Sequence, residues 1–389
     1  MKVTQSQMSR TQQLDKLRII PVRDRKSLRQ FIRLPWSIYR SDPCWVPPLL
    51  FERKQHVSSH NPYFAHARWQ AWLALCGARP VGRISAQVDQ LYLQRYSDAT
   101  GFFGMLEAED ASAIFQSLLN TAEIWLRGQG MDRVVGPFNF SINDECGLLI
   151  DGFDTPPSVK MAHGRAYYAR RIEALGYAPA KDLLAYRLTE RGFTAPEAMR
   201  ALVSKKAGQV HLRPLDRSRL DVEFGILRDI FNDAWSENWG FVPFTEAEFA
   251  HIGRSLAPLL NDDFVRIAEV DDDPAAMIVI VSNLNEIIRD LDGRLLPWGW
   301  FKLFWRLRRG DLKTARIPLL GVRKRYQKSL LGIALAFMLI DAVYIPLFKR
   351  VTEVEMSWIL EDNLKIRHII EALGGVCYKR YRIYQKALG

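Results

Sequence analysis

The chain has 389 residues, 48% of them hydrophobic and 25% charged, and this composition excludes a largely disordered protein. At roughly 150 residues per domain, the length predicts two or three domains. The formal net charge of +11 favours an anionic partner, which is a nucleic acid, a phosphate-bearing cofactor or an acidic membrane.

The cysteines and the first residues of the chain indicate the compartment. The four cysteines stand far apart without a CxxC pair or zinc-like spacing: Cys44, Cys76, Cys146 and Cys377. They are interpreted as reduced thiols, and no cluster of histidine and carboxylate residues has ligand spacing, so no metal is expected. Residues 1–20 contain no apolar signal-peptide core, which favours a cytoplasmic location.

The first half of the chain alternates strand-like and helix-like patterns. WQAWLALCG (residues 69–77), PVGRISAQVD (80–89) and GFFGMLEAED (101–110) are typical of strands. A helix is predicted over 110–127, with Asp110 as its N-cap. A further strand is predicted at DLLAYRL (182–188).

The second half repeats this alternation. FVRIAEVDD (264–272) and AAMIVIVSNL (275–284) predict a hairpin, and KTARIPLLGV (313–322) predicts a further strand. A helix from about Leu330, the strand EVEMSWIL (353–360), a helix from Asn363 and a final strand follow. This order predicts an α/β fold with a mixed sheet.

An internal repeat suggests a duplication. IEALG occurs at 172–176 and again at 370–374, and in both copies a tyrosine follows ten residues after the glycine, at Tyr186 and Tyr384. The openings RIIPVRDRKSL (18–28) and HLRPLDRSRL (211–220) are also alike. We therefore expect two similar domains, 1–205 and 206–389, although two unrelated α/β domains with common helix endings remain an alternative.

The stretch LLGVRKRYQKSLLGIALAFML (319–339) has the strand–loop–helix pattern of one superfamily. It resembles the GNAT acyltransferases, which carry a Q/R-x-x-G-x-G/A loop between a strand and a helix. Gln327 takes the first position and Gly332 the last, with Leu330 where a glycine is usual; a frame running from Ser329 to Ala334 fits as well. The resemblance implies two tandem GNAT-like domains, each a mixed, mostly antiparallel sheet flanked by helices.

In GNAT enzymes, backbone N–H groups of this loop hold the pyrophosphate of coenzyme A at the start of the helix. The resemblance therefore implies acyl-CoA as co-substrate, bound in the second domain. The residues expected to hold it are Val322, Arg323, Lys324, Arg325, Gln327, Lys328, Ser329 and Gly332. The same residues would also suit a solvated basic loop. The first domain has the acidic stretch GFFGMLEAEDASAIF at this place and is expected to lack a coenzyme A site.

Longer stretches from both halves resemble a narrower group. They are GPFNFSINDECGLLIDGFDTPP (136–157), AWSENWGFVPFTEAEF (234–249), LLGVRKRYQ (319–327) and EMSWILEDN (355–363). The chain is similar there to the bacterial ceramide synthase group of GNAT proteins. This resemblance implies transfer of a fatty acyl group from acyl-CoA to the amine of a long-chain sphingoid base.

Amide formation from a thioester needs a group that takes the proton of the amine. Glu145, between two hydrophobic runs, is the first candidate base. His163 is the second, predicted on one helix face with Tyr167. Glu355 is a third catalytic candidate, on a strand near the expected thioester. The tyrosine that acts as general acid on the family's last helix is replaced by Ile172 and Ile370, so the acid is absent or is supplied elsewhere.

Further polar and aromatic residues near these candidates are expected to contact the acceptor. The predicted substrate-binding residues are Asn143, Tyr167, Tyr168, Trp235, Asn238 and Trp239. For any single aromatic or histidine, a place in the core is the alternative.

The stretch LLPWGWFKLFWRLRR (295–309) alternates aromatic and basic residues. Such a segment is typical of a headgroup interface, so we expect residues 295–309 to face an anionic membrane; packing of the same stripe in the core is the alternative. The protein is then peripheral on the inner membrane. Residues 330–348 are long and apolar enough to span a bilayer, but Asp341 and Pro346 favour a buried helix.

Two other functions fit parts of the sequence. A Fem-like aminoacyltransferase is also a basic tandem GNAT protein, but it usually carries a long helical arm, and no heptad-patterned segment is found here. A non-catalytic scaffold that binds a membrane or nucleic acid would explain the degenerate glycine loop. We favour the acyltransferase with a lipid amine acceptor, without a nucleic acid partner.

Overall fold

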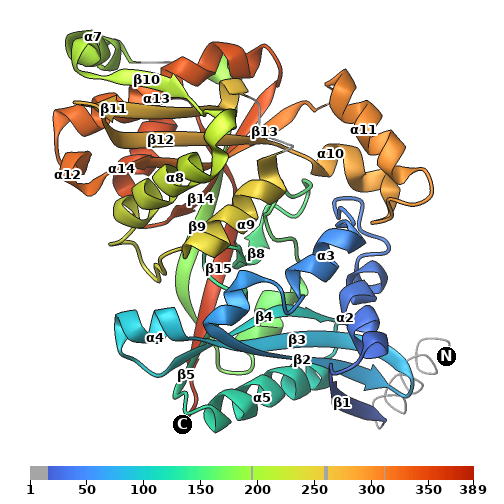
Figure 1. The fold of residues 1–389 in the computed structure, drawn as a ribbon. Coiled ribbons are helices and arrows are strands. Elements are labelled where there is room, and N and C mark those ends of the chain that lie inside the picture. Colours follow the sequence, from blue (N-terminus) through green and yellow to red (C-terminus); the bar gives the residue numbers. More distant parts are fainter. Residues whose placement is uncertain (1–15, 194–195, 258–261, 311) are drawn as a thin grey trace. The chain divides into compact units, whose positions relative to one another are not determined.

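The structure is a computed structural model that describes residues 16–193, 196–257, 262–310 and 312–389. Residues 1–15, which carry most of the N-terminal segment considered above, lie outside this description. The chain forms two compact units (Figure 1). Unit 1 comprises Met1–Asp182 and Tyr381–Gly389, and unit 2 comprises Leu183–Arg380. The chain therefore passes from unit 1 to unit 2 at 182/183 and returns to unit 1 at 380/381, whereas the sequence repeat predicts a boundary at 205/206.

Unit 1 contains helices on either side of a strand-rich core. Its helices are α2 (Arg25–Ile38), α3 (Leu50–His56), α4 (Gln90–Tyr96), α5 (Ser112–Gly128) and α6 (Tyr167–Glu173). Its strands, with the start of β9, are β1 (Leu17–Pro21), β2 (Ala67–Cys76), β3 (Arg79–Asp89), β4 (Thr100–Ala108), β5 (Arg133–Gly136), β6 (Phe138–Asn139), β7 (Glu145–Cys146), β8 (Leu148–Asp151) and β9 (Ala178–Thr189).

The sheet of unit 1 is antiparallel from β1 through β2 and β3 to β4, and β4 then pairs with β5 in parallel. Successive side chains of a strand point to opposite sides, and helices pack on both sides, so this sheet is buried on both faces. In β2, Trp72 and Ala74 join the core under α5, while Leu73 joins the core that includes Phe31 of α2.

Unit 2 repeats this plan. Its helices are α7 (Glu197–Lys206), α8 (Leu220–Ala234), α9 (Glu246–Leu256), α10 (Asn285–Ile288), α11 (Gly299–Arg309), α12 (Lys324–Gln327), α13 (Leu330–Phe348) and α14 (Leu364–Ala372). Its strands, with the end of β9 and the start of β15, are β10 (His211–Pro214), β11 (Val265–Val270), β12 (Asp273–Ser282), β13 (Thr314–Val322), β14 (Glu353–Leu360) and β15 (Val376–Ala387).

In unit 2 the strands β10, β11, β12 and β13 pair in antiparallel order, and β13 then pairs with β14 in parallel. Ile278 of β12 packs in the core under α13, and its neighbour Met277 packs under α8 and α9. The predicted mixed α/β fold is therefore confirmed, with helices packed on both faces of the strands in each unit.

The last strand of each sheet comes from the other half of the sequence. β15 ends in unit 1, where Tyr384 is opposite Gly136 of β5. β9 ends in unit 2, where Thr189 is opposite Glu353 of β14. The repeated residues pair in the same crossed way: the Tyr384 hydroxyl donates to Glu173 at 2.9 Å, and the Tyr186 hydroxyl donates to Glu371 at 2.8 Å.

The apolar helix α13 is a packing element of unit 2. Leu335, Leu339 and Val343 belong to the core that covers β11 and β12. Among the described residues it is the one helix long and apolar enough to cross a membrane, and half of its most apolar window is buried. Pro346 lies within the helix, close to its end.

Candidate functional site

The two parallel strands of unit 2 separate part-way along their length. β13 and β14 pair from Thr314↔Glu353 to Ile317↔Met356. Beyond this point β13 follows β12 up to Val322, whereas β14 follows β9. The parallel pairing thus ends at a fork, where the facing edges of β13 and β14 pair with no strand among the residues that the structure describes.

A buried polar network lies at this fork. The Arg316 guanidinium donates to the Ser357 hydroxyl at 2.8 Å and to the Ser357 carbonyl oxygen at 3.1 Å. Its Nε atom lies 3.8 Å from Oε1 of Glu355, and the hydroxyls of Ser357 and Tyr378 each donate to one oxygen of this carboxylate. Arg316, Glu355 and Ser357 are each less than 10% exposed.

The strand alternation places this network on a defined face of the sheet. Val354, next to Glu355, packs in the core under α13. Since successive side chains alternate, Glu355 points to the other face, which α8 and α9 cover. The predicted catalytic candidate Glu355 is therefore a buried carboxylate held by a cation and two hydroxyls.

The basic loop after β13 is partly neutralised by neighbouring segments. Lys324 pairs with Glu237 at 2.8 Å, and Arg325 forms an ion pair with Asp273. Arg323 donates to the Pro274 carbonyl oxygen at 2.6 Å. Lys328 is exposed at the end of the loop. These contacts fix the loop and leave a concentration of positive charge before α13.

The loop is closed tightly onto the helix. Gln327 donates to the carbonyl oxygens of Val322 and Ala234 at 2.8 and 2.9 Å. Ser329 is the N-cap of α13, and its hydroxyl accepts from the Gly332 N–H at 3.1 Å. A Cβ atom at Gly332 would lie 2.1 Å from the Tyr326 carbonyl oxygen, so only glycine allows this approach.

The predicted substrate residues of the segment after α8 are half-buried. Trp235 stacks on Phe231 with ring centroids 4.7 Å apart, and a Cβ atom at Gly321 would lie 2.4 Å from the indole. Trp235 therefore packs directly on β13. The Asn238 N–H donates to the Trp235 carbonyl oxygen at 2.8 Å, which forms the turn that carries Trp239.

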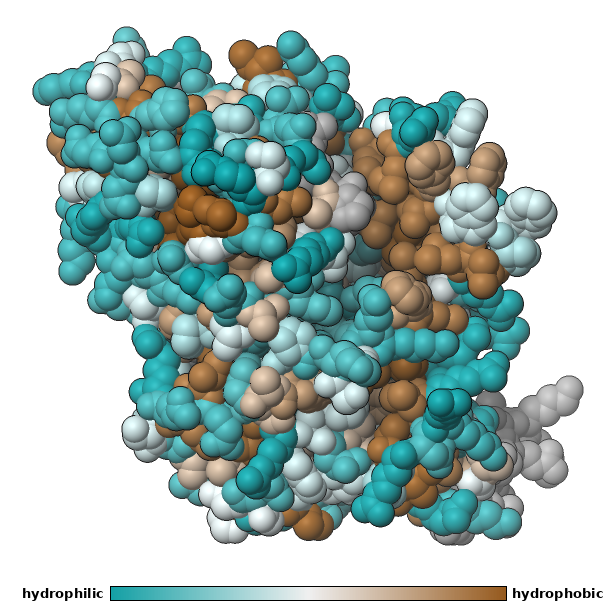
Figure 2. Space-filling model, viewed as in Figure 1, coloured by the Kyte–Doolittle hydropathy of each residue, from teal (hydrophilic) through white to brown (hydrophobic). Residues whose placement is uncertain are grey.

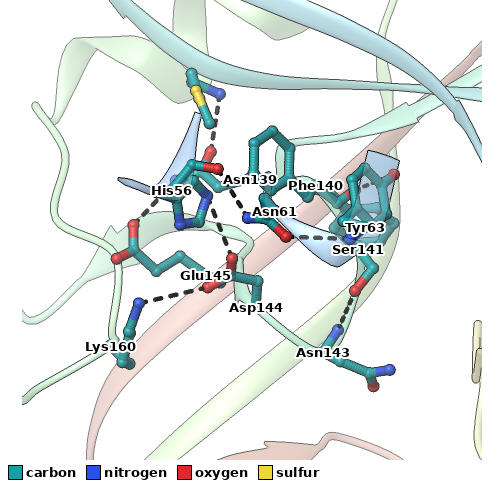
Figure 3. Close-up of polar contacts among 12 residues, drawn as sticks. His56, Asn61, Tyr63, Asn139, Phe140, Ser141, Asn143, Asp144, Glu145 and Lys160 are labelled. Atoms are coloured by element: carbon teal, nitrogen blue, oxygen red, sulfur yellow. Dashed lines mark hydrogen bonds and ion pairs between the residues drawn. The ribbon is translucent and has the colours of Figure 1, made fainter. Parts of the chain in front are cut away.

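Unit 1 has a different polar cluster, near the hairpin of β6 and β7 (Figure 3). Arg53 of α3 donates to Glu145 at 2.9 Å, and Asn139 donates to the same carboxylate at 3.1 Å. Arg53 also pairs with Glu52, which accepts from Lys160 at 2.9 Å. Sequence reasoning missed Glu52, Arg53 and Lys160, because nothing in their local pattern distinguishes them from surface charges.

The environment of Glu145 makes it a weak base. Burial alone would raise the pKa of this carboxyl, but the charges of Arg53 and Lys160 lower it to about 2. A general base works best with a pKa close to the working pH. Glu145 is thus better suited to anchoring α3 on the hairpin than to proton transfer. Asn143 lies in the same loop, where its N–H donates to the Ser141 hydroxyl at 3.2 Å.

The predicted helix face that joins His163 to Tyr167 is wrong. Helix α6 begins only at Tyr167, and His163 belongs to the preceding irregular segment. Its Nε2 atom lies 3.1 Å from Asp42, which also pairs with Arg165 at 3.3 Å. His163 and Glu145 therefore belong to separate networks of unit 1.

The two tyrosines predicted to bind substrate pack α6 against β4. The Tyr167 hydroxyl donates to the Ala108 carbonyl oxygen at 2.6 Å, and the Tyr168 hydroxyl donates to Glu107 at 2.7 Å. Tyr39 donates to the same oxygen of Glu107 at 2.7 Å. Tyr168 is only 1% exposed, so its ring is packed inside unit 1.

The segment predicted to face a membrane forms α11 with its preceding turn. None of its helical residues is buried, so the alternative of core packing is wrong for this stripe. Trp298, Trp300, Phe301 and Trp305 are each at least half exposed. Figure 2 shows apolar side chains gathered at the surface over this part of unit 2. Arg306 pairs with Asp290 and ties the helix to the preceding turn.

Solved structures with the same fold define the class of the protein. The chain superimposes on a tandem GNAT protein from the clavulanic acid biosynthesis pathway with a TM-score of 0.56 and 14% identity, over 96% of this chain and 99% of that one. It superimposes on a GCN5-related N-acetyltransferase from Sphaerobacter thermophilus with a TM-score of 0.52 and 11% identity, over 96% of each chain. The fold is therefore that of tandem GNAT proteins.

Sequence relatives identify the family. The chain is 46% identical over 375 residues to the bacterial ceramide synthase of Caulobacter vibrioides (strain NA1000 / CB15N), covering 96% of this chain and 98% of that protein. It is 46% identical over 366 residues to protein YghO of Escherichia coli (strain K12), covering 94% of each. No protein-family model matches the chain. The protein is an N-acyltransferase with the GNAT fold. It belongs to the family that contains bacterial ceramide synthase and YghO.

Proposed function

We propose that the protein transfers a fatty acyl group from acyl-CoA to the amine of a long-chain sphingoid base and so forms a ceramide. The observation that carries this proposal is the 46% identity, over nearly the whole of both chains, to a protein named bacterial ceramide synthase. The exposed aromatic face of α11 supports a lipid substrate, because such a substrate has to be taken from a membrane.

The donor site that we propose is the fork of unit 2 with the loop before α13. The first turn of a 19-residue helix attracts phosphate through its N–H groups and its dipole. The basic loop of Val322, Arg323, Lys324, Arg325, Gln327, Lys328, Ser329 and Gly332 adds positive charge at this place. The close approach at Gly332 keeps the loop compact, which suits a phosphate cradle. Trp235, Asn238 and Trp239 are the proposed substrate contacts beside it.

Unit 1 has no comparable basic loop at the equivalent place, so we propose a single donor site. Glu109 and Asp110 follow β4, and they pair with Arg79 and with Arg171. Carboxylates at this point repel phosphate. The proposal therefore divides the units into one that holds acyl-CoA and one that does not.

We propose Glu355 as the catalytic group nearest the thioester. An ammonium loses two protons when it becomes an amide, and the second must pass from the attacking nitrogen to the leaving sulfur. Glu355 can accept this proton and return it to the thiolate. Arg316 and the two hydroxyls hold the carboxylate in a fixed position for this transfer. The roles predicted for Glu145 and His163 as bases, and for Asn143, Tyr167 and Tyr168 as acceptor contacts, remain hypotheses with less geometric support.

We also propose that α11 holds the enzyme on the cytoplasmic face of the inner membrane. Its exposed indole and phenyl rings suit the acyl boundary of a bilayer, and Lys302, Arg308 and Arg309 suit anionic lipid headgroups. Binding to vesicles with and without an anionic phospholipid tests this directly. Equal binding to vesicles with and without the anionic phospholipid would contradict the role of the basic residues.

The experiment that tests the function mixes purified protein with palmitoyl-CoA and sphinganine in detergent. Free thiol and N-palmitoyl product are then measured, the product by mass spectrometry. Product together with equimolar thiol is the expected result. Thiol without product would mean that the acceptor is another amine. If neither appears and no coenzyme A species binds, the protein is a non-catalytic scaffold.

A further inference from the structure

One histidine of unit 1, His56, lies against the Asp144 carboxylate, and Figure 3 marks the contact with a dashed line. Nε2 of His56 lies 3.3 Å from Oδ2 of Asp144. This nitrogen is buried, and among the described residues it has no hydrogen-bond partner, because the direction of the contact is unfavourable. The His56 side chain is 6% exposed and its ring stacks on Phe140, with centroids 4.3 Å apart. A buried polar atom without a partner is costly and calls for an explanation.

The charges around this pair do not balance. Three carboxylates, those of Glu52, Asp144 and Glu145, stand against two cations, Arg53 and Lys160. With a neutral imidazole the cluster therefore carries one net negative charge. An additional cation that donates hydrogen bonds would neutralise it and would also supply the missing donor between His56 and Asp144.

The cluster already accommodates an amine. The Lys160 ammonium lies 2.9 Å from Glu52 and 4.0 Å from Asp144, so its second contact is too long for a hydrogen bond. One oxygen of Asp144 lies near Lys160 and the other lies near His56, and neither contact is a short ion pair. Glu52 and Lys160 are 36% and 33% exposed, which makes them the solvent-facing edge of an otherwise buried cluster.

We propose that this cluster binds the ammonium group of the acyl acceptor and that His56 takes its first proton. The inference rests on the proposed function and adds the acceptor site to it. The ligand is a primary ammonium on an aliphatic chain: its N–H groups donate to Asp144, to Glu52 and to Nε2 of His56. In the transfer, one N–H bond of the ammonium breaks and an Nε2–H bond forms, which leaves a neutral amine and an imidazolium beside Asp144.

The surroundings set the direction in which His56 titrates. Burial is the largest influence and lowers the pKa of His56, while Asp144 and Glu52 oppose this and Arg53 and Lys160 add to it. The imidazole is therefore neutral at neutral pH and free to accept a proton. As the pH falls through this lowered pKa, His56 becomes protonated before the amine arrives, so kcat/KM for the acceptor must fall on the acid side, below pH 6.5.

The test uses octylamine as the probe and octanol as the uncharged probe of equal chain length. Binding to the intact protein is measured by titration calorimetry without acyl donor, for the wild type and for His56→Gln, Asp144→Asn and His60→Gln. Both cluster variants should lose about tenfold or more in octylamine affinity, the value of one charge-assisted hydrogen bond. Octanol binding should be unchanged. His60 is an exposed histidine of the same unit and serves as the matched control.

The donor affinity separates this inference from the proposed function. Palmitoyl-CoA should bind all three variants as it binds the wild type. Thermal unfolding of each variant should match that of the wild type, which shows that unit 1 is folded. The acid limb of the acceptor pH profile should disappear in His56→Gln and persist in His60→Gln. Unchanged octylamine affinity in both cluster variants, or an unchanged acid limb in His56→Gln, would overturn the inference. Specific amine binding without amide formation would overturn the proposed function and leave the ammonium site in place.

Discussion

The two units place different side chains on the same parallel strand pair. At the third pair of the parallel register, unit 1 has Phe102 opposite Val135, and unit 2 has Arg316 opposite Glu355. All four side chains are buried. A buried charge persists only when it is paired and hydrogen-bonded, as Glu355 is by Arg316 and Ser357. The apolar pair in unit 1 shows that the scaffold does not need charges there, and this difference is the reason for proposing a catalytic role for Glu355.

The loops that follow differ in the same sense. After β4 the chain continues with Glu109 and Asp110 into α5, whose N-cap Ala111 has no side-chain hydrogen bond. After β13 it continues with four basic residues, Arg323, Lys324, Arg325 and Lys328, to α13, which Ser329 caps. One unit thus disfavours an anion at its helix start and the other favours it. The two units share one arrangement of strands and helices, and the donor site that we propose lies in unit 2.

The largest expected effect is that of Glu355→Gln at the fork. Loss of the proton-accepting carboxylate should lower kcat by about a hundredfold or more, with coenzyme A affinity unchanged. Steady-state turnover and titration calorimetry measure the two quantities. Glu353→Gln, a half-buried glutamate two residues earlier on β14, is the control and should keep its activity. Full activity of Glu355→Gln would remove the proposed functional difference between the parallel strand pairs of the two units.

The next effect concerns stability in unit 1. Glu145→Gln removes a carboxylate that accepts from Arg53 and Asn139, which should cost about 2 kcal/mol of unfolding free energy. The pKa of Glu145 in the folded protein is about 2, below its ordinary value of 4.5. The carboxylate therefore stabilises the fold fully above pH 4.5 and loses this effect as the pH falls towards 2.

Urea unfolding at pH 7 and at pH 3 tests this linkage. The difference in stability between wild type and Glu145→Gln should be large at pH 7 and smaller at pH 3. An unchanged unfolding free energy combined with lost turnover would instead restore Glu145 as a catalytic base.

A smaller effect is expected from reversing one charge before α13. Lys328→Glu should weaken coenzyme A binding by about tenfold at low salt, and the effect should shrink at high salt because exposed charges are screened. Lys205→Glu, at an exposed position of α7, is the charge-matched control. Equal affinities in the two variants would place the phosphates elsewhere.

The smallest effect is on the two helix caps. Ser329→Ala should destabilise unit 2 by about 1 kcal/mol, because the Gly332 N–H loses its acceptor. The opposite change, Ala111→Ser, should stabilise unit 1 by up to about 1 kcal/mol, since Ala111 has the extended backbone of an N-cap. Thermal unfolding of both variants measures the pair. A loss of stability in Ser329→Ala together with a gain in Ala111→Ser would support the comparison of the two caps. Changes of the same sign would contradict it.

The local patterns predicted most elements correctly. The alternating runs became β2, β3, β12 and β14, and the predicted start at Asn363 is the N-cap of α14. Asp110 was expected to cap α5, but its carboxylate binds Arg171 at 2.8 Å and the helix begins at Ser112. Near His163 the helix begins late; Gly164, a poor helix former, follows that histidine directly. Local signals thus predict elements well but not the competing contacts at their ends.

The sites were less accessible to sequence reasoning because their partners are remote. Glu145 meets Arg53 across 92 residues, and Arg316 meets Ser357 across 41. A strand pattern also does not specify which sheet a strand joins, so the repeated IEALG predicted two similar units but not their exchange of strands. The charged loop before α13 was recognisable because its residues are consecutive.

The exchange of β9 and β15 has a consequence for how the protein is made. On the ribosome, the sheet of unit 1 cannot gain its last strand until residues 381–389 have been synthesised, after all of unit 2. Until then the edge of β5 is unprotected and open to aggregation. Expression of either half alone is therefore expected to give insoluble protein, and co-expression of both halves should rescue it. A tag or truncation at residue 389 should disturb unit 1, most of which is far away in the sequence, more than unit 2.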